Sequence, residues 1–193
     1  DVSLVGSEMC IRDRYIVVEA DESDGSFIHL QPDVAVLTNI DDDHLTHFNN
    51  IFENLLDSFI LFAENVPFYG YMVINGDDKN IKKISKRISR PKITFGVTNN
   101  CDYQIVSISP KEGKQEFKII DKKKKKTYKF HINLPGKHNI YNAAASITVS
   151  LEEGIPITKI KKAINEFTGV GRRYEKHNIM LGSKRITLID DYG

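Results

Sequence analysis

Two acidic clusters hold the side chains best suited to chemistry in this chain. "EADESD" covers residues 19–24 and "NIDDDH" covers residues 39–44, and each cluster follows a short apolar run. Converging carboxylates suit a hard cation such as Mg2+, which takes oxygen ligands and therefore favours the aspartates of the second cluster over His44. Acidic residues at strand ends also cap helices and order turns, so a solvated turn explains these clusters equally well.

The tetrapeptide "GKHN", residues 136–139, is a second candidate because it stands at the start of a predicted helix. Gly136 permits a close approach, and the first turn of a helix offers N–H groups. The carboxamide of Asn139 has the donor and the acceptor needed to read an adenine edge. An ordinary helix start is the alternative interpretation.

The stretch "GVGRRYE", residues 169–175, is a third candidate. Two glycines before paired arginines indicate a flexible segment whose cations could meet phosphate when a neighbouring domain closes. A solvent-exposed arginine pair without a ligand is the alternative.

The first half of the chain alternates strand and helix patterns, which is typical of a parallel sheet flanked by helices with right-handed crossovers. Ligands bind beyond the carboxyl ends of the strands in such folds, so the two acidic clusters are predicted to face one pocket. The predicted strands are residues 15–20, 33–40, 69–75 and 92–96, and the predicted helices are residues 50–65 and 77–89.

The pattern then changes to antiparallel strands followed by helices. Five consecutive lysines, Lys122–Lys126, are predicted to form a solvated hairpin tip rather than a polyanion site. The predicted fold class is therefore α/β, with a mostly parallel sheet flanked by helices and an additional small antiparallel sheet. Strands are predicted at residues 101–110, 114–121, 126–134 and 184–193, and helices at residues 135–155 and 156–167.

Composition restricts the classes of partner that the chain is expected to bind. The 193 residues carry a net charge of +1 and 27% charged residues, which favours neither nucleic acid nor a membrane surface. Cys10 and Cys101 have no metal-ligand spacing, so neither a disulfide framework nor a structural zinc site is indicated. Residues 1–14 have no strand or helix periodicity and are predicted to be a non-native extension.

Five motifs in residues 15–193 occur in the order and at the spacing that resemble the Mur ligases. They are "VVEADESDGSFIHLQPDVAVLTNIDDDHL", "LPGKHNIYNAAAS", "EEGI", "FTGVGRRYE" and "IDDYG". Within the family, "EADESD" and "DDYG" are most similar to the ligases that join L-alanine to UDP-N-acetylmuramate. The resemblance implies an ATP- and Mg2+-dependent amide ligase of cytoplasmic peptidoglycan synthesis, without a nucleic-acid or membrane partner. It does not indicate an oligomeric state.

The resemblance also implies roles for individual residues. Glu19 and His44 match the Mg2+ ligands of the family. The positions that match contacts to ATP are His138, Asn139, Arg173 and Asp191. Tyr192 matches a substrate-side position, and Arg173 and His44 are the implied catalytic residues.

The domain boundaries follow from the same resemblance. Residues 15–175 are expected to form an incomplete central ATP-binding domain, and residues 176–193 a linker and the first strand of the C-terminal ligase domain. No glycine-rich loop followed by Lys-Ser or Lys-Thr occurs in the chain, so we expect a fragment that is inactive on its own. The alternatives are a murein tripeptide ligase, a folylpolyglutamate synthase and a non-catalytic nucleotide-binding module.

Overall fold

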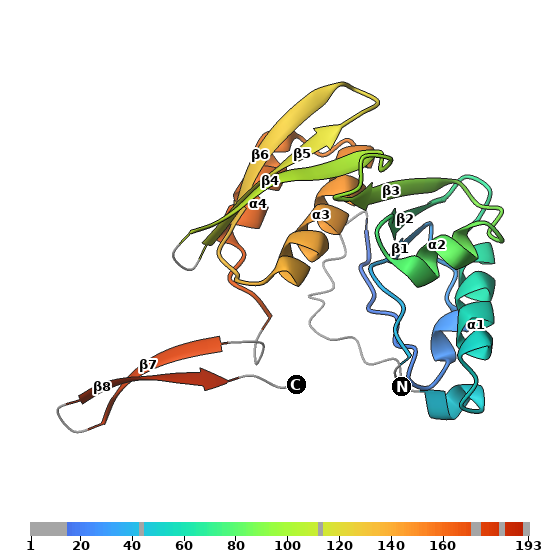
Figure 1. Ribbon diagram of the computed structural model, residues 1–193, viewed down its shortest axis with the longest axis horizontal. Coiled ribbons are helices and arrows are strands. Elements are labelled where there is room, and N and C mark those ends of the chain that lie inside the picture. Colours follow the sequence, from blue (N-terminus) through green and yellow to red (C-terminus); the bar gives the residue numbers. More distant parts are fainter. Residues whose placement is uncertain (1–14, 43–44, 112–113, 171–174, 182–183, 191–193) are drawn as a thin grey trace. The chain divides into compact units, whose positions relative to one another are not determined.

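The computed structural model describes residues 15–42, 45–111, 114–170, 175–181 and 184–190 (Figure 1). The chain divides into two compact units. The first unit comprises residues up to Ile74 together with Asp78–Lys92, and the second comprises Asn75–Asp77 and Ile93–Gly193. None of the helices in the described ranges is long and apolar enough to cross a membrane.

The first unit is built on a parallel pair of strands with helices beside it. β1 (Val34–Leu37) pairs with β2 (Tyr71–Asn75) so that Val34 lies opposite Tyr71 and Leu37 opposite Ile74. The connection between these strands contains a 3-10 helix (Leu45–Phe48) and α1 (Phe52–Glu64). This strand–helix–strand unit confirms the predicted parallel pairing.

The core of the first unit forms where α1 packs its apolar face. Leu55, Leu56, Phe62 and Ala63 of this helix are buried. Phe27, from the 3-10 helix Ser26–His29, contacts Phe59 and Phe62 with ring-centroid distances of 5.0 and 5.5 Å. Burial of these large side chains supplies most of the free energy that holds the unit together.

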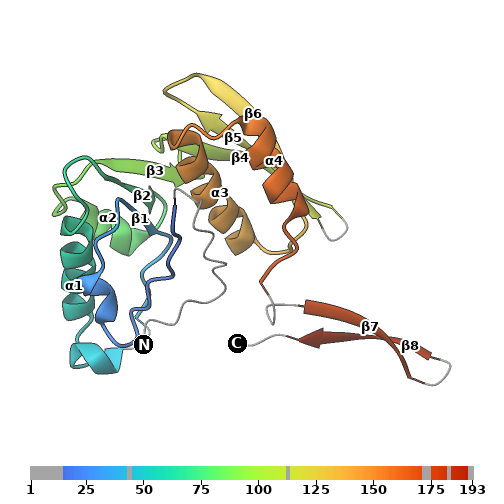
Figure 2. The same cartoon turned by 180° about the vertical axis from the view of Figure 1, so that it is seen from behind.

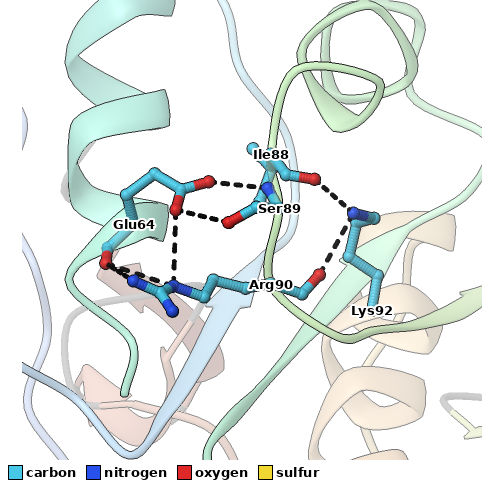
Figure 3. Close-up of polar contacts among 5 residues, drawn as sticks. All are labelled: Glu64, Ile88, Ser89, Arg90 and Lys92. Carbon is cyan, nitrogen blue, oxygen red and sulfur yellow. Dashed lines mark hydrogen bonds and ion pairs between the residues drawn. The ribbon is translucent and has the colours of Figure 1, made fainter. Parts of the chain in front are cut away.

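The end of α1 is fastened by one carboxylate, that of Glu64 (Figure 3). It accepts hydrogen bonds from the backbone N–H and the hydroxyl of Ser89, both at 2.6 Å. The guanidinium of Arg90 donates to the Glu64 carbonyl oxygen, with Nη2 at 2.7 Å, and its Nε lies 3.4 Å from the carboxylate. These contacts attach the residues before β3 to the helix.

The second helix of this unit is shorter than its pattern predicts. α2 (Lys79–Ser85) begins after Asp78, whose carboxylate accepts hydrogen bonds from the backbone N–H groups of Asn80 and Ile81. A capping side chain of this kind satisfies donors that have no partner within the helix. The predicted start at Asp77 is therefore wrong, because Asp77 stands outside the helix.

The strand predicted at residues 15–20 is also absent. The structure has no regular element there, and the side chains of Ile16 and Val17 are 75% and 87% exposed. Apolar β-branched residues favour extended backbone, but a strand also needs a hydrogen-bonded neighbour. Within the described ranges, no strand pairs with this segment.

The second unit combines a parallel pair with a larger antiparallel sheet. β3 (Lys92–Gly96) runs parallel to β4 (Tyr103–Lys111), which pairs antiparallel with β5 (Lys114–Asp121). β5 in turn pairs antiparallel with β6 (Lys126–Ile132). The predicted α/β class is confirmed, as is the exposed lysine-rich hairpin tip between β5 and β6.

Two helices cover one face of the antiparallel sheet (Figures 1 and 2). α3 (Lys137–Glu152) packs against β4 and β5, and α4 (Ile157–Glu166) packs against β6. The alanines at positions 143, 144 and 145 of α3 are buried.

The remaining strands form a separate two-stranded sheet. β7 (Glu175–Leu181) pairs antiparallel with β8 (Lys184–Asp190). The sequence predicts β8 but not β7. The β7 segment contains only three consecutive strongly apolar residues, Ile179–Leu181, so its pairing with β8 decides its conformation.

Candidate functional site

A cavity of about 320 Å³ opens beyond the carboxyl end of β1 in the first unit. Its floor is apolar and includes Phe27, Leu55 and Phe59, whereas its polar wall includes Glu19, Glu22, Thr38, Asn39 and Asp41. Both acidic clusters therefore contribute to one cavity, as predicted, although only the second cluster follows a strand. A cavity with an apolar floor and a few converging polar groups is the usual form of a ligand site.

The carboxylates of the two acidic clusters accept hydrogen bonds from different groups. Asp21 accepts a hydrogen bond from the Ser23 N–H, and Asp24 accepts one from the Ser26 N–H, both at 2.8 Å. The hydrogen bonds from Ser26 hold the pKa of Asp24 below its ordinary value. These two aspartates order their own turn, which is the alternative role that the sequence left open.

Asp41 and Glu19 are the exposed carboxylates that flank the cavity. Asp41 accepts a hydrogen bond of 2.6 Å from the Asn39 side chain, and Thr38 donates to the oxygen of the same Asn39 amide. Carboxylate oxygens in this setting fit Mg2+, which is held in proteins by one or two carboxylates together with phosphate oxygens and waters.

A glycine brings the residue that follows the first acidic cluster against the 3-10 helix that follows the second. Gly25 ends the first cluster with φ of +71°, and a Cβ atom built on it would lie 2.5 Å from Nε2 of His47. The imidazole of His47 also meets the ring of Phe48 edge-on, with centroids 5.4 Å apart. The glycine is therefore required twice, by its backbone conformation and by the ring packed on it.

The structure describes only one of the two predicted metal ligands, Glu19. His44 lies outside the described residues, as does Asp43. Among the residues that the structure describes, no group of three or more His, Cys, Asp or Glu side chains could hold a metal ion. Glu19 lines the cavity, and the pairing of Glu19 with His44 stays a prediction.

The second predicted site, at the start of α3, belongs to the second unit. Gly136 precedes the helix with φ of +92°, and it has no side chain that could cap the helix. His138 is exposed, and Asn139 is half-buried, with its Nδ2 donating a 2.6 Å hydrogen bond to the carbonyl of Pro135. The Asn139 side chain is therefore oriented by the loop before its own helix.

Tyr141 and Gln115, which the sequence analysis missed, hold this turn in place. Tyr141 donates a hydrogen bond of 2.8 Å from its hydroxyl to Asp77, which also accepts from the N–H groups of Val97 and Thr98. Burial raises the pKa of Asp77, but these hydrogen bonds outweigh burial and hold the pKa below its ordinary value. Burial and the bond to Asp77 raise the pKa of Tyr141.

Gln115 of β5 is the other missed residue. Its side chain is buried, and its Nε2 donates to the carbonyl of Leu134 at 2.7 Å and to that of Gly136 at 2.8 Å. A signal was present in the sequence, because Gln115 shares the alternating face of Phe117 and Ile119. A polar side chain on a buried face needs hydrogen-bond partners.

The other predicted site residues cannot be placed. Arg173, Asp191 and Tyr192 lie outside the described residues. Their roles in binding ATP or substrate stay predictions.

Comparison with known proteins identifies the family. Residues 3–150 match the model of the Mur ligase middle domain. The chain is 42% identical over 180 residues to UDP-N-acetylmuramate–L-alanine ligase of Vesicomyosocius okutanii, and this match covers 93% of the chain but 38% of the relative. The ligase of the same name from Psychrobacter cryohalolentis is 40% identical over 181 residues, with the same two coverages. The chain thus spans well under half the length of these relatives.

Solved structures share the fold. The crystal structure of UDP-N-acetylmuramate-alanine ligase MurC from Thermotoga maritima superposes with a TM-score of 0.74 at 24% identity, covering 90% of this chain and 38% of that one. UDP-N-acetylmuramate:L-alanyl-gamma-D-glutamyl-meso-diaminopimelate ligase from Neisseria meningitides gives a TM-score of 0.65 at 27% identity, covering 80% and 48%. The chain belongs to the Mur ligases, and residues 3–150 match the middle domain of that family.

Proposed function

We propose that this chain is part of an ATP-dependent ligase that joins L-alanine to UDP-N-acetylmuramate. The observation that carries the proposal is the identity of 40–42% to ligases of that name, maintained over 93% of the chain. Residues 15–175 would belong to the central ATP-binding domain, and residues 176–193 to a linker and the first strand of the ligase domain. Such an enzyme would act in the cytoplasm, and the near-neutral net charge favours neither a nucleic-acid nor a membrane partner.

The proposed chemistry makes a poor electrophile reactive. The carboxylate of UDP-N-acetylmuramate attacks the γ-phosphorus of ATP, and the bond to the leaving ADP breaks. The amine of L-alanine then attacks the resulting acyl phosphate, and the tetrahedral intermediate expels phosphate as the amide forms and the amine loses a proton. Positively charged groups lower the barrier by balancing charge on the transferring phosphoryl group.

Residues of this chain would act at three places in that reaction: the Mg2+ ion, ATP and the substrate. Glu19 and His44 would hold Mg2+, which neutralises phosphate charge when it is bound. His138, Asn139, Arg173 and Asp191 would bind ATP, while Tyr192 would lie on the substrate side. His44 and Arg173 would act closest to the transferring phosphoryl group.

A grafted ligase tests the proposal. It is the Psychrobacter cryohalolentis enzyme in which the aligned segment is replaced by residues 15–193 of this chain. We expect it to form UDP-N-acetylmuramoyl-L-alanine with one ADP released per product. A folded graft that hydrolyses no ATP and forms no product contradicts the proposal.

Two matched carboxylate variants refine the test, because Glu19 and Glu22 both line the cavity. Glu19→Gln should lower kcat/KM by at least about tenfold, since it removes one charged ligand worth about 1.4 kcal/mol or more. Glu22→Gln should stay within about threefold of the unsubstituted graft. Equal losses for both variants would contradict the role of Glu19.

The likeness to the Neisseria enzyme favours one alternative, a murein tripeptide ligase. The graft takes its selective domain from the host enzyme, so it does not separate the two substrates. Assaying the product of the complete gene with L-alanine and with tripeptide does so, and a preference for tripeptide would favour the alternative.

A further inference from the structure

The loop before α3 is held by a side chain of β5, that of Gln115. Gln115 is 7% exposed, and its Nε2 donates to the backbone carbonyls on either side of Pro135, those of Leu134 and Gly136. A buried amide with two short hydrogen bonds is costly to lose, because both carbonyls would then lack this donor. The position of Pro135 therefore depends on Gln115.

The orientation of Asn139 depends in turn on Pro135. Nδ2 of Asn139 donates to the Pro135 carbonyl at 2.6 Å, which fixes the plane of the carboxamide. One N–H of the carboxamide is used in this way, which leaves its oxygen as an acceptor and its second N–H as a donor for a ligand. An acceptor recognises an exocyclic amino group and disfavours a carbonyl at the same place.

The first turn of α3 has a second support. The hydroxyl of Tyr141, two residues beyond Asn139, donates to Asp77 at 2.8 Å. A Cβ atom at position 96 would lie 2.6 Å from the Asp77 carboxylate, so Gly96 is what lets this carboxylate approach β3. Asp77 thus connects the turn to the backbone N–H groups of Val97 and Thr98.

We propose that Gln115 is a positioning residue for nucleotide selection and acts through Pro135 on the Asn139 carboxamide. Asp77 and Tyr141 form the second support of this turn. The inference rests on the proposed function, because it assigns Asn139 to the base of ATP. Gln115 itself does not touch the nucleotide. Its loss is expected to weaken discrimination between an amino purine and an oxo purine.

The first measurement compares ATP with ITP, which carries a carbonyl in place of the adenine amino group, in the grafted ligase. Gln115→Met keeps the length of the side chain but removes both donors. We expect the ratio of kcat/KM for ATP to that for ITP to fall about 3- to 10-fold, the effect of one misaligned hydrogen bond, mainly through KM for ATP. Tyr141→Phe, which removes one oxygen atom, should produce a smaller fall in the same direction.

A matched control lies at the other end of the same helix. The hydroxyl of Tyr103 donates to Glu152 near the end of α3, so Tyr103→Phe removes the same kind of tyrosine–carboxylate hydrogen bond. It should lower the melting temperature yet leave the ATP to ITP ratio unchanged. An unchanged ratio in Gln115→Met, or an equal fall in Tyr103→Phe, overturns the inference.

The second measurement does not depend on activity. In the full 193-residue chain, Gln115→Met should speed hydrogen exchange of the backbone amides of residues 137–141 without affecting the end of α3 near Glu152. Exchange that is unchanged at residues 137–141 overturns the inference even if the grafted ligase is active. An inactive unsubstituted graft counts against the proposed function, and the exchange experiment still decides the positioning role.

Discussion

At the scale of single residues, Glu64 offers a test of what holds the first unit together. Its pKa is lowered, first by the hydrogen bonds from Ser89 and then by the charges of Arg90 and Lys92, against an ordinary value of 4.5. A depressed pKa in the folded state means that the ionised carboxylate stabilises the fold. That contribution is complete above about pH 5 and is lost as the pH falls through the folded pKa.

Glu64→Gln should therefore lower the free energy of unfolding at neutral pH by about 1 kcal/mol, because the amide retains only one of the two acceptors and no charge. The difference from the unsubstituted chain should shrink below about pH 4. Urea unfolding at several pH values measures both effects. Glu53→Gln on the same helix is the control, since the exposed pair of Glu53 with Lys83 should contribute little. A difference that grows as the pH falls would contradict the assignment.

The residues that position Asn139 show which site features the sequence could reveal. Asn139 and Glu19 stand in motifs, so they were predicted as candidates and the structure places both. Gln115 is 24 residues before Asn139 in the chain, and nothing local connects the two. Its role depends on a hydrogen bond between β5 and the loop before α3, which only the fold brings about.

At the scale of elements, the turn at Gly25 packs against the 3-10 helix Leu45–Phe48. Gly25→Ala forces an L residue into φ of +71° and places a methyl group against His47. Gly154 has the same φ of +71°, but nothing lies within 4 Å of the position its Cβ would take. Comparing alanine substitutions at these two glycines therefore separates the effect of backbone strain from the effect of the contact with His47.

We expect Gly154→Ala to cost about 1 kcal/mol of stability, the strain alone, and Gly25→Ala about 2–3 kcal/mol. Thermal or urea unfolding measures both. Adding His47→Ala to Gly25→Ala should recover the excess over Gly154→Ala, because the double variant removes the clash. No recovery would show that the ring does not press on the turn.

Elements with strong periodicity were predicted well, and those that depend on a partner were not. The predicted strands at residues 92–96 and 114–121 match β3 and β5 residue for residue. The segment 15–20 has an equally strong apolar pattern, yet the structure gives it no strand. Conversely, β7 has a weak pattern and forms through its pairing with β8. Pairing is a property of two segments, and a pattern within one segment cannot supply it.

At the scale of the whole molecule, the isolated chain is expected to bind ATP poorly. The sequence contains no glycine-rich loop followed by Lys-Ser or Lys-Thr, so it has neither the backbone N–H cradle nor the lysine that such sites use for phosphates. Isothermal titration of the 193-residue chain with Mg-ATP should show no binding in the micromolar range. The grafted ligase, which regains the host's loop, is the control. Micromolar affinity of the isolated chain would contradict this expectation.

Family membership was the property that the sequence predicted best, because it depends on five motifs in order rather than on any single contact. The acidic clusters, GKHN and GVGRRYE each had a plain structural alternative, and the structure confirms that alternative for Asp21 and Asp24. The order of motifs identifies the family, whereas the role of each side chain depends on the residues around it.

The two supports of the α3 turn differ in how far apart their partners lie along the chain, and this has a consequence for folding. Gln115 reaches carbonyls 19 and 21 residues away, whereas Tyr141 and Asp77 are separated by 64 residues. Closing the longer loop costs about 1 kcal/mol more in chain entropy. During refolding, the start of α3 is therefore expected to attach to β5 first and to be joined to Asp77 afterwards.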